Sequence, residues 1–237
     1  MARGILHRPV VRVALIATRL LAGAAVALVG SAAAPRQAPE ATGAAAEATP
    51  AAPVTVDGFR SARWGMNGAE VKAAIQRDFG IPPTKVATTE NAAERTTILT
   101  IEVGNLLDGA GTSRLSYVFG YKSKALIQVT ILWGTPVDPR IPAEAIVTAA
   151  NQLRQLFLDS GYVSKSIIAN SRLADGSILV FEGQDAAKHR TVLHLTGSSS
   201  PAKGPHDKGG VANIALSLSY ILNSANPDIF RLKKGQF

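Results

Sequence analysis

Two stretches of the chain place apolar residues at intervals of three and four, the spacing of a helix with one buried face. The stripes are Val71, Ala74, Ile75 and Phe79 in the first stretch and Ile146, Ala150, Leu153 and Phe157 in the second. Asn67 and Glu70 form the pattern of a capping box before the first stripe, and Gly80 ends that helix. Pro142 suits the first turn of the second helix, and Gly161 follows its end.

Apolar and polar residues alternate in the stretches that follow each helix, which is the pattern of β-strands with one buried face. The first group of runs is Arg95–Val103, Thr112–Tyr121 and Ala125–Gly134, and the second is Tyr162–Ala169, Ser177–Glu182, Thr191–Gly197 and Ala212–Leu222. The three residues Lys122–Lys124 are few enough to join two strands as a hairpin. The pattern therefore predicts antiparallel pairing within each group.

Helices and groups of strands alternate along the chain, which predicts an α+β fold. We expect two αβββ halves, about residues 57–134 and 139–223, with the helices packed on a mainly antiparallel sheet. The repeated order indicates a pseudo-repeat, although the two halves share little sequence identity. Both halves belong to one predicted globular domain, residues 54–237.

The N-terminus has the order of a secretory signal peptide, which we predict over residues 1–33. Its first part is rich in arginine and free of acids, Leu20–Val29 is apolar, and the small residues Ser31 and Ala33 suit cleavage after Ala33. An uncleaved anchor is the alternative, but Arg19 leaves an apolar stretch of about 15 residues, and a bilayer span needs roughly 20. We therefore expect a periplasmic protein, associated with the membrane only if the signal stays uncleaved.

Residues 34–53 differ in composition from the rest of the chain, because they are rich in alanine and contain four prolines. Nothing in this stretch is periodic or large enough to pack against a core. It is predicted to be a disordered linker between the signal peptide and the globular domain.

Composition and charge exclude several classes of function. The first 53 residues hold five arginines and two glutamates, so the net charge of +8 falls to +5 for the remainder. The remaining basic residues are scattered and do not alternate with aromatic residues, which argues against nucleic-acid binding. The chain has no cysteine, which excludes disulfides, thiolate nucleophiles and cysteine-bound metals. No cofactor is expected.

The segment Gly58–Lys72 reads GFRSARWGMNGAEVK, and it resembles the F…WGM…EV opening of many small bacterial envelope proteins. The order of one helix and then three strands is similar to the outer-membrane-assembly lipoprotein fold and the β-lactamase-inhibitor-protein fold. The resemblance implies an interaction module, because members of such folds mostly bind proteins and lack catalytic residues. The chain departs from the assembly lipoprotein in its greater length and in having no lipid-bearing cysteine, and no functional residue carries over.

Few residues qualify as catalytic or metal-binding candidates. His189 and His194 are five residues apart, so on a regular strand they point to opposite faces and do not share a metal. The acidic candidates are Asp175, Glu182 and Asp185. They gather near strand ends, where ordinary turns explain them as well as acid–base chemistry does. A hydrolase would need one of these histidines, or His206, to meet both a hydroxyl and a carboxylate.

Three further features have a structural and a functional interpretation. Gly197–Gly210 is predicted to be a long loop, either flexible or in contact with a partner. Trp64 and Trp133 each precede a glycine, and each is either a core residue or an interface anchor. The tail after Asn226 either docks on the sheet through a short helical turn or binds a partner or an anionic surface.

We place the predicted partner-binding surface on the Arg60–Met66 segment and the C-terminal tail. Its residues are Arg60, Arg63, Trp64, Met66, Phe230, Arg231, Lys233 and Lys234. Arginine beside large apolar residues is the composition that interface hot spots favour. The Gly197–Gly210 loop has charge but no apolar anchor. The alternative is that the aromatic residues of both segments belong to the core.

Together these observations predict a non-catalytic periplasmic protein-interaction module: an accessory subunit, an assembly factor or an inhibitor. Its expected partner is another envelope protein. A periplasmic small-molecule or lipid-binding protein is the alternative, with a pocket between sheet and helices. A hydrolase is less favoured, because no nucleophile motif occurs in the chain.

Overall fold

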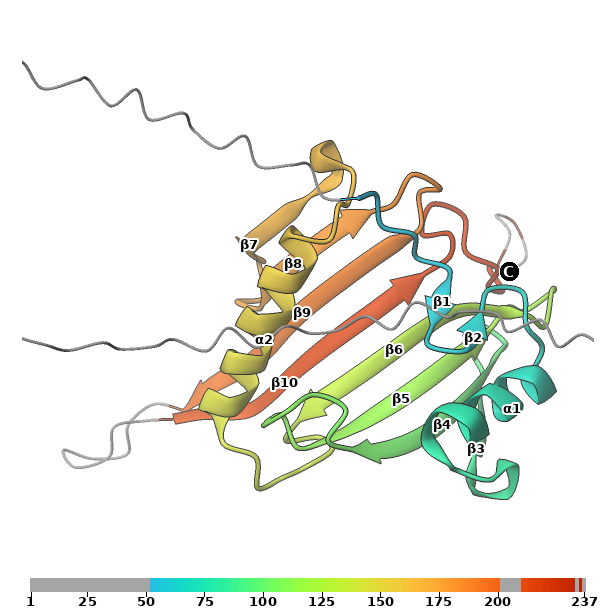
Figure 1. Ribbon diagram of the computed structural model, residues 1–237, viewed down its shortest axis with the longest axis horizontal. Coiled ribbons are helices and arrows are strands. Elements are labelled where there is room, and N and C mark those ends of the chain that lie inside the picture. The colour runs from blue at the N-terminus through green and yellow to red at the C-terminus, as the bar shows by residue number, and fades with distance from the viewer. Residues whose placement is uncertain (1–51, 201–209, 233–234, 236–237) are drawn as a thin grey trace, which may run out of the picture. The chain divides into compact units, whose positions relative to one another are not determined.

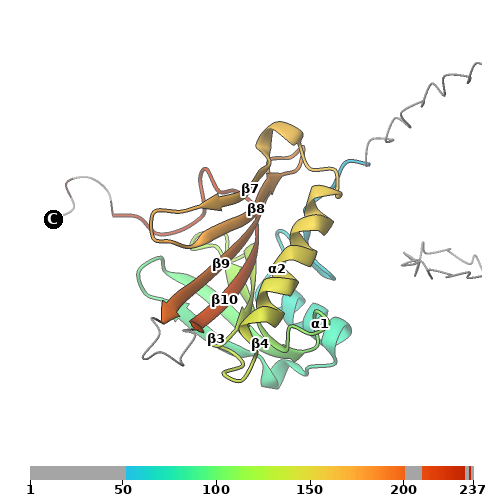
Figure 2. The same cartoon turned by 90° about the vertical axis from the view of Figure 1, so that its left-hand side faces the viewer.

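The computed structural model describes residues 52–200, 210–232 and 235, and it contains one large antiparallel sheet with two helices on one of its faces (Figure 1, Figure 2). The helices are α1 (Gly68–Phe79) and α2 (Ala143–Leu158), and 3-10 turns follow them at Pro83–Lys85 and Ser164–Ser166. The large sheet consists of β3 (Ala87–Asn91), β4 (Thr96–Gly104), β5 (Thr112–Phe119), β6 (Leu126–Gly134), β7 (Ile168–Arg172), β8 (Ile178–Gln184), β9 (Arg190–Ser200) and β10 (Gly210–Ile221). A separate hairpin is formed by β1 (Gly58–Phe59) and β2 (Ala62–Arg63). The predicted α+β class is confirmed.

Several predicted features fall outside the described residues. They are the signal peptide, the linker up to residue 51, His206, Lys233 and Lys234. Among the residues that are described, no helix combines the length and the apolar character needed to cross a membrane.

The sheet is built from two similar halves that meet at its centre. The strand order is β3-β4-β5-β6-β10-β9-β8-β7, so each half is a four-stranded meander and the last strands of the two halves pair with each other. This central pair is antiparallel, with Trp133 opposite Leu216. Gly80 and Gly161, the two 3-10 turns, and the starts of β3 and β7 are all separated by the same 81 residues. The equal spacing agrees with the predicted pseudo-repeat.

The strand that each half adds to the predicted αβββ order is an edge strand: β3 was not predicted, whereas β7 overlaps the end of the run predicted at Tyr162–Ala169. β3 reads Ala-Thr-Thr-Glu-Asn and is mostly exposed, so it has no apolar alternation that could indicate a strand. In the second half, the run predicted from Tyr162 starts only at Ile168. Tyr162 instead packs into the core, and a 3-10 turn separates it from β7.

The helix face of the sheet forms the core, as the alternation predicted. The inward side chains of β4, β5 and β6 are buried: Leu99, Ile101, Leu115, Tyr117, Phe119, Val129, Ile131 and Trp133. Burying each of these contributes about 1.5–3 kcal/mol relative to exposure. An irregularity near the start of β6 places Leu126 in the core in place of Ile127, and Tyr121 lies beyond the end of β5.

The predicted helix signals are largely present. The Asn67 side chain accepts hydrogen bonds from the N–H groups of Ala69 and Glu70, and the Glu70 carboxylate accepts one from the Asn67 N–H at 2.8 Å. Gly80 ends α1 with φ +69°. Pro142 stands just before α2 and not inside its first turn.

Candidate functional site

The Arg60–Met66 segment begins in the β1–β2 hairpin, which is anchored to the end of α1. Ser61 donates from its backbone N–H and from its hydroxyl to the Asp78 carboxylate, at 2.9 and 2.6 Å. Gly58 has φ +139°, and a Cβ at this position would overlap the Ala62 carbonyl, so a glycine is required. The hairpin is therefore held in a defined position.

Two arginines of this hairpin are exposed to solvent. The Arg60 guanidinium lies 4.7 Å from the ring centroid of Phe79 and 5.9 Å from that of Phe59. Arg63 pairs with Asp57 at 3.3 Å, and both side chains are about half exposed. Such a surface pair adds little stability, so both arginines stay accessible to a partner.

Trp64 and Met66 pack toward the core. Trp64 Nε1 donates to the Val56 carbonyl at 2.7 Å, and the Met66 carbonyl accepts from the Leu126 N–H at 2.8 Å. Both side chains are half-buried against the core cluster, and Trp133 is fully buried. For both tryptophans the core interpretation accounts for the contacts seen here.

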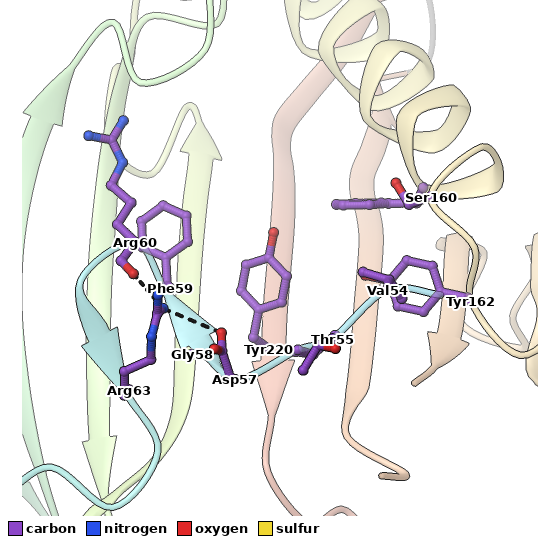
Figure 3. A pocket seen from close by; sticks show the side chains of 12 residues that line it. Val54, Thr55, Asp57, Gly58, Phe59, Arg60, Arg63, Ser160, Tyr162 and Tyr220 are labelled. Carbon is purple, nitrogen blue, oxygen red and sulfur yellow. Dashed lines mark hydrogen bonds and ion pairs between the residues drawn. The ribbon is translucent and has the colours of Figure 1, made fainter. Parts of the chain in front are cut away.

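A pocket of about 260 Å³ lies between this hairpin, the end of α2 and β10 (Figure 3). Its aromatic lining consists of Phe59, Phe157, Tyr162 and Tyr220. Phe59 stacks on Tyr220 with 5.9 Å between ring centroids, and the Tyr162 hydroxyl donates to Thr191 at 2.8 Å. The pocket is smaller than the 300–1,000 Å³ typical of ligand sites.

Tyr220 offers a test of this packing at high pH. Burial raises the pKa of the Tyr220 hydroxyl well above its ordinary value of 10.0. Because the unfolded chain loses this proton first, the stability that the neutral hydroxyl contributes is lost as the pH rises above about 10. We expect Tyr220→Phe to unfold at a higher pH than wild type in an alkaline titration followed by circular dichroism. Tyr121→Phe is the control, and an equal shift there would contradict the assignment.

The C-terminal tail docks on two turns of the first half. The Phe230 N–H donates to the Glu94 carbonyl at 2.8 Å, and the Phe230 ring meets Tyr121 edge-on at 5.5 Å. The Arg95 guanidinium lies 3.8 Å from the Phe230 ring centroid. The prediction that the tail docks through a short helical turn at Ile229 is wrong. The described tail is not helical, and its backbone forms hydrogen bonds with the two turns. Arg231 beside it is exposed.

Asp228 anchors this tail in the β5–β6 turn. Its carboxylate accepts from the N–H groups of Lys122 and Ser123 at 3.0 and 2.8 Å, and its carbonyl accepts from the Tyr121 N–H at 2.8 Å. Burial raises the pKa of Asp228, but the hydrogen bonds from Ser123 and Lys122 together outweigh burial and lower it. The tail is thus bound through an ionised carboxylate.

Gly120 leaves the space that the Asp228 carboxylate occupies, because a Cβ there would overlap this carboxylate and the Ser123 hydroxyl. We expect Gly120→Ala to release the tail while the sheet stays folded. Trypsin should then cleave after Arg231 several times faster, since tails without backbone contacts are cut readily. Gly104→Ala is the matched control, because a Cβ there meets nothing within 4 Å. Unchanged cleavage in the Gly120 variant would contradict this account.

The end of the Arg60–Met66 segment bonds the first residue of β6, and the tail bonds the β5–β6 turn that precedes it, at one end of the sheet (Figure 1). Leu126 bonds the Met66 backbone on one side of the turn, and Asp228 bonds Lys122 and Ser123 on the other. The described members of the predicted partner-binding set are thus brought to one end of the molecule.

Among the described residues, the polar candidates do not meet in the arrangement of a catalytic triad. His189 Nδ1 lies 3.0 Å from Asp185, and His194 Nε2 lies 2.8 Å from the Ser177 hydroxyl. Ser177 donates to Asp175 at 2.5 Å, so the hydroxyl stands between histidine and carboxylate, whereas a catalytic triad has the histidine in the middle. In the described part of the chain neither histidine meets both groups, and no three His, Asp or Glu residues are grouped to hold a metal.

The predicted Gly197–Gly210 loop is shorter than expected. β9 continues to Ser200 and β10 begins at Gly210, with Ser198 paired to Ala212. Glycine and serine give no apolar alternation, so this backbone pairing left no signal in the sequence. Residues 201–209 lie outside the described residues.

No protein-family model, curated protein or solved structure matches the chain. The resemblance to envelope proteins with the F…WGM…EV opening therefore stays a prediction.

Sequence reasoning missed several residues of this end of the sheet. Arg95, Tyr121 and Lys124 were assigned only to strands and a turn, yet they surround Phe230 of the tail. The two lysines of the Lys122–Lys124 turn were a weak signal of a basic surface. Nothing in the local sequence of Arg95 indicates its contact with a residue so distant along the chain.

Proposed function

We propose that the protein is a non-catalytic, periplasmic protein-interaction module that serves another envelope protein as accessory subunit, assembly factor or inhibitor. The observation that supports this best is the set of cations held on aromatic rings at the hairpin and the tail: Arg60 on Phe79, and Arg95 on Phe230. Arginine and aromatic residues dominate the binding energy of protein interfaces. A guanidinium already placed on a ring loses less conformational entropy on binding.

The polar networks support a non-catalytic role. Asp175 accepts from the Ser177 N–H and hydroxyl in the turn between β7 and β8, and Asp185 accepts from the His189 N–H in the turn between β8 and β9. These contacts satisfy local backbone groups, which is the ordinary use of Asp in turns. His189 and His194 therefore have structural partners in these turns.

A small-molecule carrier is the second candidate, and the aromatic pocket beside Phe59 and Tyr220 favours it. Its volume of about 260 Å³ suits a small planar ligand better than a lipid chain. Native mass spectrometry of protein purified without denaturation tests this. A stoichiometric adduct that Tyr220→Ala abolishes would favour the carrier over the interaction module.

Site-specific photo-crosslinking in the secreting cell tests the interaction module. A photoreactive residue replaces Arg63 in the hairpin or Arg231 in the tail. The control positions are Lys165 and Arg172, exposed bases in and just before β7, which is the edge strand of the other half of the sheet. We expect a discrete crosslinked species from the first two positions and none from the controls.

Three outcomes count against the proposal. Identical crosslinks from all four positions, or none at any position, would remove the support for a partner at this end. A solitary monomer that turns over a substrate would contradict a non-catalytic role.

N-terminal sequencing of the secreted protein tests its location, because cleavage after Ala33 predicts a mature chain that begins at Ala34.

A further inference from the structure

Three cations that lie over aromatic rings share an unusual backbone conformation. Arg60, Arg95 and Lys124 have φ values of +53°, +53° and +54°, and each stands in a turn. This left-handed region is unfavourable for residues with a Cβ, and asparagine or glycine tolerates it better. The chain does use asparagine at three other left-handed positions. A strained backbone that also holds a cationic side chain over an aromatic ring points to a role in binding.

Two of these cations lie at the docked tail. Arg95 is 3.8 Å from the Phe230 ring centroid and 5.9 Å from that of Tyr121, and the Lys124 ammonium is 5.6 Å from the Tyr121 ring. We call the surface that they form the turn-and-tail patch, which comprises Arg95, Tyr121, Lys122, Lys124, Phe230 and Arg231. Its cations come from the β3–β4 turn, the β5–β6 turn and the tail.

Two carboxylates beside this patch, those of Asp228 and Glu94, accept hydrogen bonds from other groups of the protein. Asp228 accepts from backbone N–H groups of the β5–β6 turn, and Glu94 accepts from the Asn91 side chain at 3.2 Å. The four cations are exposed, and none of them has an ion pair with any residue that the structure describes. The charges of Asp228 and Glu94 offset only part of the charge of these four cations, so the patch keeps a net positive charge that an external anion can complement. In sequence, Lys233 and Lys234 follow Arg231 after Leu232.

We infer that the turn-and-tail patch binds an acidic protein segment, one rich in aspartate and glutamate carboxylates. The inference rests on the proposed interaction function and assigns the chemistry of the partner. Arginine recognises carboxylates through two parallel hydrogen bonds, and a ring behind the guanidinium leaves its N–H edge directed outward. Attraction to an anionic membrane needs only mobile lysines and gains nothing from strained turns, so a protein segment is favoured.

The test uses the secreted mature protein and a fluorescent octaglutamate peptide, with binding followed by anisotropy at low salt. We expect Arg95→Gln to weaken binding about tenfold, the usual effect of losing one charge-assisted carboxylate contact. Arg172→Gln removes an exposed arginine from β7 and should change the affinity less than about twofold. Lys188→Gln is a second control, since Lys188 is also left-handed, at φ +68°, but has no ring contact among the described residues.

Arg95→Asn separates binding from folding. Asparagine tolerates the left-handed backbone, so relief of strain offsets the lost ring contact. We expect the melting temperature to stay within about 2 °C of wild type while binding falls as in Arg95→Gln. Equal binding by wild type and Arg95→Asn would overturn the inference.

Three outcomes separate this inference from the proposed function. If octaglutamate does not bind, or if patch and control substitutions weaken it equally, the acidic-partner inference fails. Crosslinks from Arg63 and Arg231 would then still support an interaction module. If vesicles of phosphatidylglycerol and phosphatidylethanolamine compete for the patch and octaglutamate does not, the patch is assigned to a lipid surface and the inference is overturned.

Discussion

Asp185→Ala is expected to lower the free energy of unfolding by about 3 kcal/mol, because it removes a buried carboxylate with three hydrogen-bond partners. The Asp185 side chain is 1% exposed and accepts from the Val56 N–H, the His189 N–H and His189 Nδ1 at 2.9, 2.9 and 3.0 Å. Loss of the carboxylate leaves the Val56 N–H buried without an acceptor. Urea denaturation followed by tryptophan fluorescence measures the change.

Asp175→Ala is the matched control for this experiment. Asp175 stands in the preceding hairpin turn, is exposed, and bonds only its neighbour Ser177. Its loss should cost less than about 1 kcal/mol, as surface changes usually do. Equal losses of unfolding free energy in the two variants would contradict the expected contribution of the burial of Asp185 and of its contact with Val56.

The effect of Asp185 extends beyond its own turn, because Val56 belongs to a segment that contacts both halves of the sheet. The Val54 N–H donates to the Gly161 carbonyl in the second half, and Gly65 donates to Leu126 in the first. The N-terminal segment therefore connects the halves on the helix face. Undocking it from Asp185 should also loosen the hairpin that carries Arg60.

The sequence predicts best those elements whose pattern is imposed by burial. Leu115, Tyr117 and Phe119 alternate because every second residue of β5 faces the helices, and the Asn67–Glu70 cap is a local motif. The edge strands β3 and β7 bury little, so hydrophobic pattern does not mark them. Edge pairing depends on backbone hydrogen bonds, which any side chain except proline permits.

The candidate site was harder to predict because its contacts join distant parts of the chain. The composition of the Arg60–Met66 segment and of the tail drew attention to both. Their ring partners Phe79 and Tyr121 were assigned to a helix stripe and a strand. The docking of Asp228 against Gly120 depends on a missing Cβ, and no local pattern indicates which glycine serves that purpose.

Gly134→Ala is expected to destabilise the protein by about 3 kcal/mol or more, because Gly134 stands where the two halves join. It has φ +110°, and it pairs with Ala215 at the end of β6. A Cβ would overlap the Ile214 carbonyl oxygen and lie 2.9 Å from the Ala215 Cα, both rigid backbone groups. At this position, backbone strain and the loss of β6–β10 pairing both lower the free energy of unfolding. The urea midpoint of unfolding measures the loss.

Gly68→Ala is the control that separates this clash from a general effect of adding a methyl group. Gly68 opens α1, a Cβ there meets nothing within 4 Å, and alanine favours a helix over glycine by about 1 kcal/mol. That variant should be as stable as wild type or slightly more stable. We expect Gly134→Ala to unfold in one transition at lower urea, since β6–β10 pairing unites the halves into one sheet. Two separate transitions in Gly134→Ala would instead show that each αββββ half folds independently and that the junction contributes little to cooperativity.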